Sequence, residues 1–154
     1  MSKVRGEVRG GRFRPYLELV RPPALFTAAA DSLTGWVWAS QFTQPLSGLP
    51  EWGYPLLLAL ISGCIYAAGM CTNDLFDFAE DQRDRPQRPL PSGRVQVKSA
   101  WTLAVTLQTT ALGMALIYSW LAHQTLSPLL ISAVLATIVA TYLYNGVLKN
   151  SVIA

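Results

Sequence analysis

The segment NDLFDFAEDQRDRPQRPLPSG, residues 73–93, is strongly charged although the chain around it is apolar. Of the 154 residues, 51% are hydrophobic and only 14% are charged, against about 25% charged in ordinary globular domains. The segment nevertheless holds five carboxylates and three arginines: Asp74, Asp77, Glu80, Asp81, Asp84, Arg83, Arg85 and Arg88. This contrast predicts a membrane protein in which the segment lies at a membrane surface.

Four long apolar stretches flank the segment, and each has about the 17–25 residues that a helix needs to cross the hydrocarbon of a bilayer. They contain no Lys or Arg and a single carboxylate, Asp31. Four buried helices of a soluble bundle are a weaker interpretation, because such helices carry a polar stripe with a period of about 3.6 residues, and these stretches are apolar on every face. We therefore predict an all-α integral membrane protein with four transmembrane helices, at about residues 24–40, 54–81, 99–122 and 126–145.

The positive charges predict how the chain crosses the membrane. All twelve Lys and Arg residues lie in three places: six precede the first helix, five separate the second from the third, and Lys149 follows the fourth. Because positive residues mark the cytoplasmic side, we expect the N-terminus, the 73–98 segment and the C-terminus to face the cytoplasm, in the plasma membrane of a bacterium. Residues 1–15 are then a basic cytoplasmic tail, and residues 16–154 are one membrane domain. The net charge of +3 suits anionic lipid headgroups and not nucleic acid, because no basic face is interleaved with aromatic residues.

The acidic residues of the segment fall at helical spacing. Asn73, Asp77 and Asp81 are four residues apart, and Asp74 lies three before Asp77, so one side of a helix end presents an amide and two or three carboxylates. Crowded anions repel one another and are costly to desolvate, so a cation has to neutralise them. Two sources remain open from this pattern: the arginines of the segment, folded back as ion pairs, or Mg²⁺, which binds one or two carboxylates together with substrate phosphates.

The residues after the acidic helix end favour the metal. RPQRPLPSG, residues 85–93, contains three prolines and cannot continue a helix. It predicts a stiff, ordered loop beside the acidic helix end, which a simple linker between two membrane helices would not need. Its arginines would then be free to bind phosphate through paired N–H groups.

With this loop, the segment closely resembles the first signature of the UbiA superfamily of membrane prenyltransferases. The resemblance rests on the NDxxDxxxD pattern of residues 73–81, on RPLPSG at residues 88–93, and on their place at the cytoplasmic end of the second helix. LVRP at residues 19–22 and YLYNGVLK at residues 142–149 look like the family's entry to helix one and end of helix four. The resemblance covers most of the chain from about Tyr16 onward, and it implies the first half of a UbiA-type helical bundle.

The resemblance implies an enzyme that joins a polyprenyl diphosphate to an acceptor inside the lipid bilayer, with Mg²⁺ as its cofactor. Catalysis and metal binding would fall to Asn73, Asp77 and Asp81. The residues implied to bind substrate are Asp74 at the edge of the metal site, Arg85 and Arg88 on the phosphate oxygens, and Lys149 from the next cytoplasmic loop. The long prenyl tail would lie among the apolar helices, which explains why such an enzyme is in a membrane.

The chain also departs from the family pattern. The family has roughly twice as many helices and a second acidic motif, whereas no Asp or Glu follows Asp84 here. We therefore expect an incomplete N-terminal half that needs a partner second half for turnover. The alternative is a non-catalytic membrane subunit or a relic that binds prenyl diphosphate; a transporter is a third possibility, but it leaves the arginine–proline loop unexplained.

The short link between Asp81 and Arg88 resembles the branches that act on chlorophyllide-type or glycerol-phosphate acceptors and the UbiA-like EboC proteins, and it leaves the acceptor unidentified.

Two polar residues inside the apolar stretches are further candidates for binding substrate. Asp31 is an intramembrane carboxylate, which points to function by default: it lines an acceptor cavity or acts as a base, or else it makes a hydrogen bond between packed helices. Asn145, near the end of the fourth helix, is either a polar group of the cavity or a helix cap. The sequence leaves both pairs of alternatives open.

Overall fold

The structure, a computed structural model, describes residues 13–42, 50 and 52–149. In these residues every regular element is helical, and the elements in chain order are α1 (Arg14–Val20), α2 (Pro22–Ser40), α3 (Gly53–Phe76), α4 (Phe78–Asp84), α5 (Val97–His123), α6 (Pro128–Leu143) and the π-helix η1 (Tyr144–Leu148). Most of the predicted basic tail, and the last residues of the predicted membrane domain, lie outside the described residues.

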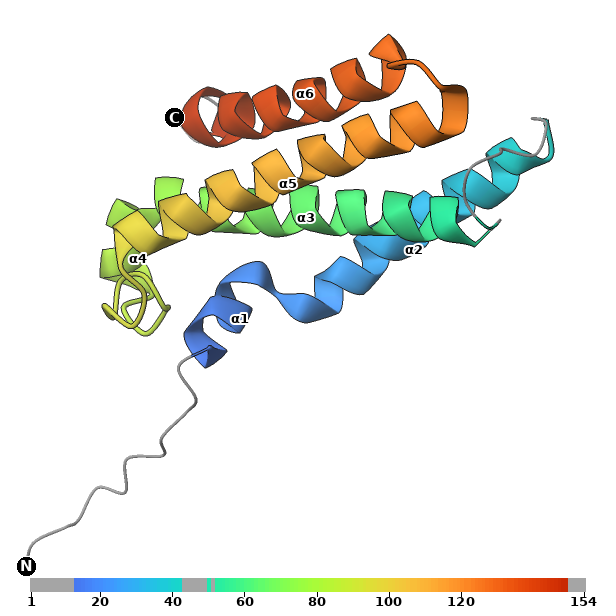
Figure 1. Cartoon of the computed structure of the whole chain (residues 1–154). Coiled ribbons are helices and arrows are strands. Elements are labelled where there is room, and N and C mark those ends of the chain that lie inside the picture. The colour runs from blue at the N-terminus through green and yellow to red at the C-terminus, as the bar shows by residue number, and fades with distance from the viewer. Residues whose placement is uncertain (1–12, 43–49, 51, 150–154) are drawn as a thin grey trace, which may run out of the picture.

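Helix α3 is the centre of the arrangement. It packs along α5 on one side, α2 crosses it on another (Figure 1), and α6 packs against both α5 and α3. Every other described helix, including the short α1, α4 and η1, makes contact with α3. Helix α3, which carries the first residues of the acidic segment, therefore has neighbours from all parts of the described chain.

Small residues bring α5 close to α3. Ala100, Ala104, Ala111 and Ala115 are fully buried and recur at spacings of four and seven residues, which places them on one side of a helix. Small side chains at such a contact let two helix backbones approach closely, which is the usual way that helices associate in a membrane. Tyr54 at the other end of α3 adds a hydrogen bond of 3.1 Å to the carbonyl oxygen of Leu121.

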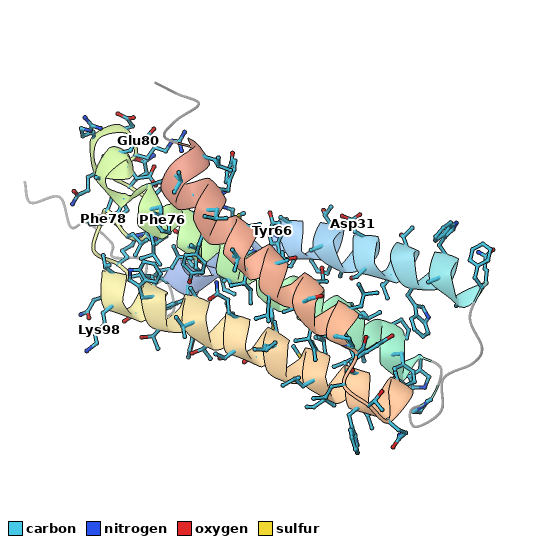
Figure 2. The ribbon with its side chains drawn as sticks, turned by 90° about the horizontal axis from the view of Figure 1, so that it is seen from above. Asp31, Tyr66, Phe76, Phe78, Glu80 and Lys98 are labelled. Carbon is cyan, nitrogen blue, oxygen red and sulfur yellow. The ribbon has the colours of Figure 1, made fainter. Side chains whose placement is uncertain are left out.

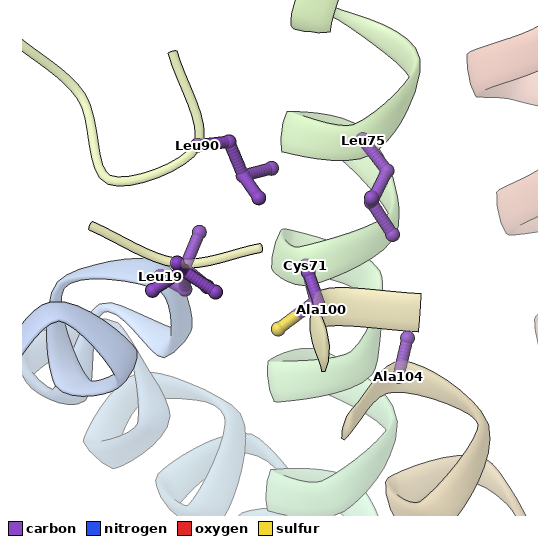
Figure 3. Packing of buried hydrophobic residues seen from close by; sticks show 7 residues of the cluster. Leu19, Cys71, Leu75, Leu90, Ala100 and Ala104 are labelled. Atoms are coloured by element: carbon purple, nitrogen blue, oxygen red, sulfur yellow. The ribbon is translucent and has the colours of Figure 1, made fainter. Parts of the chain in front are cut away.

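A buried cluster near α4 fastens the proline loop and α1 to the main helices. Figure 3 shows Leu19 of α1, Cys71 and Leu75 of α3, Leu90 of the loop and two alanines of α5 converging at this point. Residues 85–96 do not form a helix, in agreement with the prediction from the three prolines. Successive turns shape the loop instead, with backbone hydrogen bonds such as that from Gly93 to Leu90, 3.0 Å long.

Two of the predicted helices differ from the structure. The helix predicted over residues 54–81 breaks at Asp77, whose ψ of 0° lies outside the α-helical range, and continues as α4. On either side of the break, the amide of Asp77 reaches the carbonyl oxygen of Asn73 at 2.9 Å and that of Asp81 reaches Asp77 at 2.8 Å. The helix predicted over residues 126–145 widens into η1 at its end, where the glycine at position 146 leaves room for the ring of Phe76: a Cβ there would lie 3.3 Å from that ring.

The number of spans also differs from the prediction of four. Among the described residues, three helical stretches are long and apolar enough to cross a membrane: Gly53–Phe76, Val97–Ala122 and Pro128–Leu148. Helix α2 has 19 residues but does not join them, because two prolines, Asp31, Ser32, Thr34 and Gly35 lower its mean hydropathy. The structure thus supports an all-helical membrane protein and does not confirm a fourth span.

Replacing Gly93 by Ala should destabilise the protein by about 1 kcal/mol, because Gly93 has a φ of +73° that is unfavourable for any residue with a Cβ. Gly113→Ala is the matched control: this glycine lies inside α5 with open space around its Cβ position, and alanine is the better helix former. Thermal unfolding in detergent micelles measures both variants. Equal stability of the Gly93 variant and the parent would contradict the described loop conformation.

Candidate functional site

The charged groups at the α4 end of the bundle separate into two clusters, on different sides of α3. The first, the Asp77 cluster, consists of Asn73, Asp77 and Lys149. The second, the Asp74 cluster, consists of Arg21, Asp74, Asp81, Arg85 and Arg88. Figure 2 shows this end of the molecule, where Glu80 marks α4 and Phe76 lies at the end of α3.

The Asp77 cluster joins the break after α3 to the residue that follows η1. The side-chain amide of Asn73 donates a hydrogen bond of 2.9 Å to one carboxylate oxygen of Asp77. The ammonium group of Lys149 donates to the other oxygen at 2.5 Å. Asn73, Asp77 and Lys149 are each only partly buried, so this amide, carboxylate and cation remain within reach of a ligand.

The Asp74 cluster is a ladder of ion pairs in which buried carboxylates meet partly exposed arginines. Arg88 lies between two carboxylates, 2.6 Å from Asp81 and 3.6 Å from Asp74. Arg21 binds Asp74 at 3.0 Å, and Arg85 lies 3.7 Å from Asp81. Asp74 and Asp81 are 5% and 3% exposed, so three guanidinium groups neutralise two desolvated anions.

The sequence predicted that Asn73, Asp77 and Asp81 share one face of a helix, but the structure places Asp81 in a different cluster from the other two. Straight helical geometry would align Asn73, Asp77 and Asp81, whereas the break at Asp77 turns Asp81 toward Arg88 and leaves Asn73 beside Asp77. Arg88 and Arg85, predicted to bind phosphate, have carboxylate partners in the chain. Across the part of the chain that the structure describes, no three His, Cys, Asp or Glu side chains are grouped as a metal site.

A cavity of about 660 Å³ opens beside the Asp77 cluster, between α2, α3 and α6 with η1. Asn73 lines it at one end, and its walls include Tyr66, Met70, Tyr144 and Asn145. The side chain of Asn145 is 6% exposed. Most of the lining is apolar, so the cavity suits a ligand with one polar end and a long apolar remainder.

Asp31 lines the same cavity far from Asn73. Ser62 donates a hydrogen bond of 3.0 Å to the carbonyl oxygen of Ala28, which places this part of α2 level with Ser62 on α3. Asn73 follows 11 residues after Ser62, or about 16 Å along a helix. Figure 2 likewise shows Asp31 farther from the Glu80 end than Tyr66, so Asp31 lines a part of the cavity that is distant from the Asp77 cluster.

Sequence reasoning did not single out Arg21 as a site residue. Its charge contributed only to the predicted orientation of the chain in the membrane, although the structure pairs it with the acidic motif across 53 residues. In the sequence, Arg21 is distinguished only by its place between the short helix and the Pro-Pro pair that opens α2. That place indicates a helix boundary, and it does not indicate which residue Arg21 pairs with.

Comparison with known proteins identifies the family. The model of the UbiA prenyltransferase family matches residues 23–154. The chain belongs to this family. The match confirms the resemblance seen in the acidic segment and, with the three apolar helices, supports an integral membrane protein.

Several archaeal relatives are named digeranylgeranylglyceryl phosphate synthase. That of Saccharolobus solfataricus is 32% identical over 104 residues, which are 68% of this chain and 35% of the relative. Those of Sulfurisphaera tokodaii and Metallosphaera sedula are 30% and 29% identical over 89% and 91% of this chain, and 44% and 46% of their own lengths. The chain thus spans less than half the length of these relatives. No solved structure matches it significantly.

Replacing Arg88 by Met should lower the free energy of unfolding by about 3 kcal/mol, because it removes the shared cation from two buried carboxylates. Arg83→Met is the matched control, since Arg83 is exposed on α4 and has no ion pair within the described residues. Denaturation in mixed micelles, followed by circular dichroism, measures the difference. If both variants unfold alike, the ladder does not stabilise this end of the bundle.

Proposed function

We propose that this chain binds the diphosphate of a prenyl diphosphate at the Asp77 cluster and takes part in prenyl transfer to an acceptor in the membrane. The observation that carries the proposal is the contiguity of this polar cluster with the mostly apolar cavity. A prenyl diphosphate has the same division, with an anionic diphosphate end and a hydrocarbon chain. Membership of a prenyltransferase family supports the same chemistry.

The oxygen donors of the Asp77 cluster fit Mg²⁺ in one respect: Mg²⁺ is usually held by one or two protein ligands together with substrate phosphate and water. Asp77 and the amide oxygen of Asn73 are such ligands. To bind the ion, Asp77 would give up its ion pair with Lys149, and Asp81 would have to give up its ion pair with Arg88. We propose that Asn73 and Asp77 hold the ion together with the diphosphate. Bound there, Mg²⁺ would supply positive charge to the leaving diphosphate.

The side chains around the diphosphate would have three tasks. Lys149, already beside Asp77, would donate to the phosphate oxygens and stabilise the negative charge that grows on them as the allylic C–O bond breaks. Arg85, the most exposed arginine of its cluster with a side chain 57% exposed, could turn toward the same oxygens. The apolar cavity walls would exclude water, so that the acceptor and not water takes the prenyl group.

The relatives suggest a class of substrates. Their shared name describes a glyceryl phosphate that carries two geranylgeranyl groups. We propose a donor of geranylgeranyl type and an isoprenoid lipid acceptor, with the α4 end of the bundle facing the cytoplasm. We further propose that turnover requires a part equivalent to the portion of the relatives that lies outside the matched region. Binding without turnover is the alternative for this chain by itself. The likeness to EboC proteins stays a prediction.

Replacing Asp77 by Asn should weaken Mg²⁺-dependent binding of geranylgeranyl diphosphate at least about tenfold, because it removes one charged ligand of the ion. Glu80→Gln, a carboxylate lost from the exposed side of α4, is the matched control and should bind like the parent. Isothermal titration calorimetry of the protein in lipid nanodiscs, with and without Mg²⁺, measures the affinities.

Three results would count against the proposal. The first is an absence of binding by the parent protein, the second is binding that does not depend on Mg²⁺, and the third is an equal loss in the Asp77 and Glu80 variants. Turnover with a suitable acceptor, measured on the same samples, separates an enzyme from a protein that only binds the diphosphate.

A further inference from the structure

Arg21 has an unusual backbone at the junction of two helices. Its φ of 49° and ψ of 67° are left-handed, a conformation that is unfavourable for a residue with a side chain. Arg21 is the C-cap of α1, where its amide donates to Leu17 at 3.1 Å, and its carbonyl oxygen accepts from Ala24 at 3.0 Å in the first turn of α2. An unfavourable conformation at such an elbow persists only where surrounding contacts fix it.

Two kinds of contact hold the elbow against α3: the packing of the buried Leu19 beside it and the ion pair of Arg21 with Asp74. The guanidinium of Arg21 lies 3.0 Å from a carboxylate oxygen that is buried in the last turns of α3. Asp74 directly follows Asn73 and precedes Asp77 by three residues. A displacement of Asp74 would therefore move Asn73, its neighbour in α3, and Asp77 at the break that follows α3.

Neither partner of this ion pair borders the cavity beside Asn73. Arg21 and Asp74 line a separate cavity of about 370 Å³, on the side of the proline loop, together with Arg88 and Arg94. In contrast, Ala24, three residues after Arg21, lines the large cavity with Asn73. The ion pair thus lies outside the large cavity. It connects the start of α2 to the end of α3 near Asn73, the residue at the polar end of that cavity.

We propose that Arg21 and Asp74 are positioning residues for the Asp77 cluster: their ion pair fixes the last turn of α3 against the α1–α2 elbow, and neither residue touches the substrate. This inference rests on the proposed function of the Asp77 cluster. It assigns Asp74 a positioning role, whereas Asp77, three residues later in the same acidic motif, is proposed to bind the ion and the diphosphate. Arg88 extends the same anchoring to α4, since it binds both Asp74 and Asp81.

A double-mutant cycle tests the proposal. Binding of geranylgeranyl diphosphate in the presence of Mg²⁺ is measured in nanodiscs for Arg21→Gln, Asp74→Asn and the double variant. If the two residues act only through their ion pair, each single change should weaken binding about tenfold, and the double change should add little. Arg21→Lys, which keeps the charge, should recover most of the affinity. Arg14→Gln is the control, because Arg14 is an exposed arginine on α1 whose side chain is 68% exposed.

Several outcomes would overturn the proposal. If the losses of the two single variants multiply in the double variant, each residue acts on the ligand separately. If Arg21→Gln binds like the parent, the elbow does not position the site. Failure of Arg21→Lys to recover affinity would mean that the guanidinium has a role beyond its charge in the pair.

Hydrogen exchange separates this proposal from the proposed function. In the absence of ligand, Arg21→Gln should speed amide exchange in both residues 14–24 and residues 72–84, whereas Arg14→Gln should not. If the parent protein fails to bind the diphosphate, the proposed function is wrong, and this exchange measurement alone decides whether the ion pair holds the end of α3. Unchanged exchange at residues 72–84 in Arg21→Gln would overturn the positioning role whatever the binding data show.

Discussion

The carboxylates of Asp74, at the end of the apolar helix α3, and of Asp81, in the short α4, are nearly fully buried, and the local structure depends on the cations that neutralise them. An unpaired anion in such a place carries a desolvation cost of several kcal/mol. Arg21 comes from the α1–α2 elbow, and Arg88 comes from the proline loop. Each arginine brings its own segment of chain against α3, so the charge requirement of two side chains determines where the elbow, the loop and α4 lie.

This arrangement divides the acidic motif by task. The buried carboxylates of Asp74 and Asp81 pair with arginines, whereas the partly buried Asp77 pairs with Lys149 and with Asn73, which lines the large cavity. In the proposed function, the Asp74 cluster positions the end of α3, and the Asp77 cluster binds the diphosphate. A motif of closely spaced acidic residues can therefore combine structural anchors with ligands, and only the three-dimensional pairing tells them apart.

Hydropathy and the acidic motif predicted the helical membrane class, the ordered loop after α4 and the family, which the family match confirms. They could not predict the break at Asp77, because periodicity arguments assume a straight helix. The pairings that accompany the break join residues 53 and 72 positions apart, and local spacing contains no information on such contacts. The expectation of four spans failed on α2 for a different reason: the stretch is long enough, but its prolines and polar residues lower its hydropathy. The buried alanine row of α5 was equally hidden, since a helix that is apolar on every face does not reveal which side meets its neighbour.

The central claim is that the diphosphate binds on the cavity side of α3 and not on the side of the arginine ladder. An experimental structure of the protein in nanodiscs with Mg²⁺ and geranylgeranyl S-thiolodiphosphate, an analogue with a slow leaving group, tests it most directly. The account predicts density for the diphosphate beside Asn73, Asp77 and Lys149, with the ion pair of Arg21 and Asp74 intact. Density for the diphosphate in the smaller cavity lined by Arg21, Arg88 and Arg94 would contradict it.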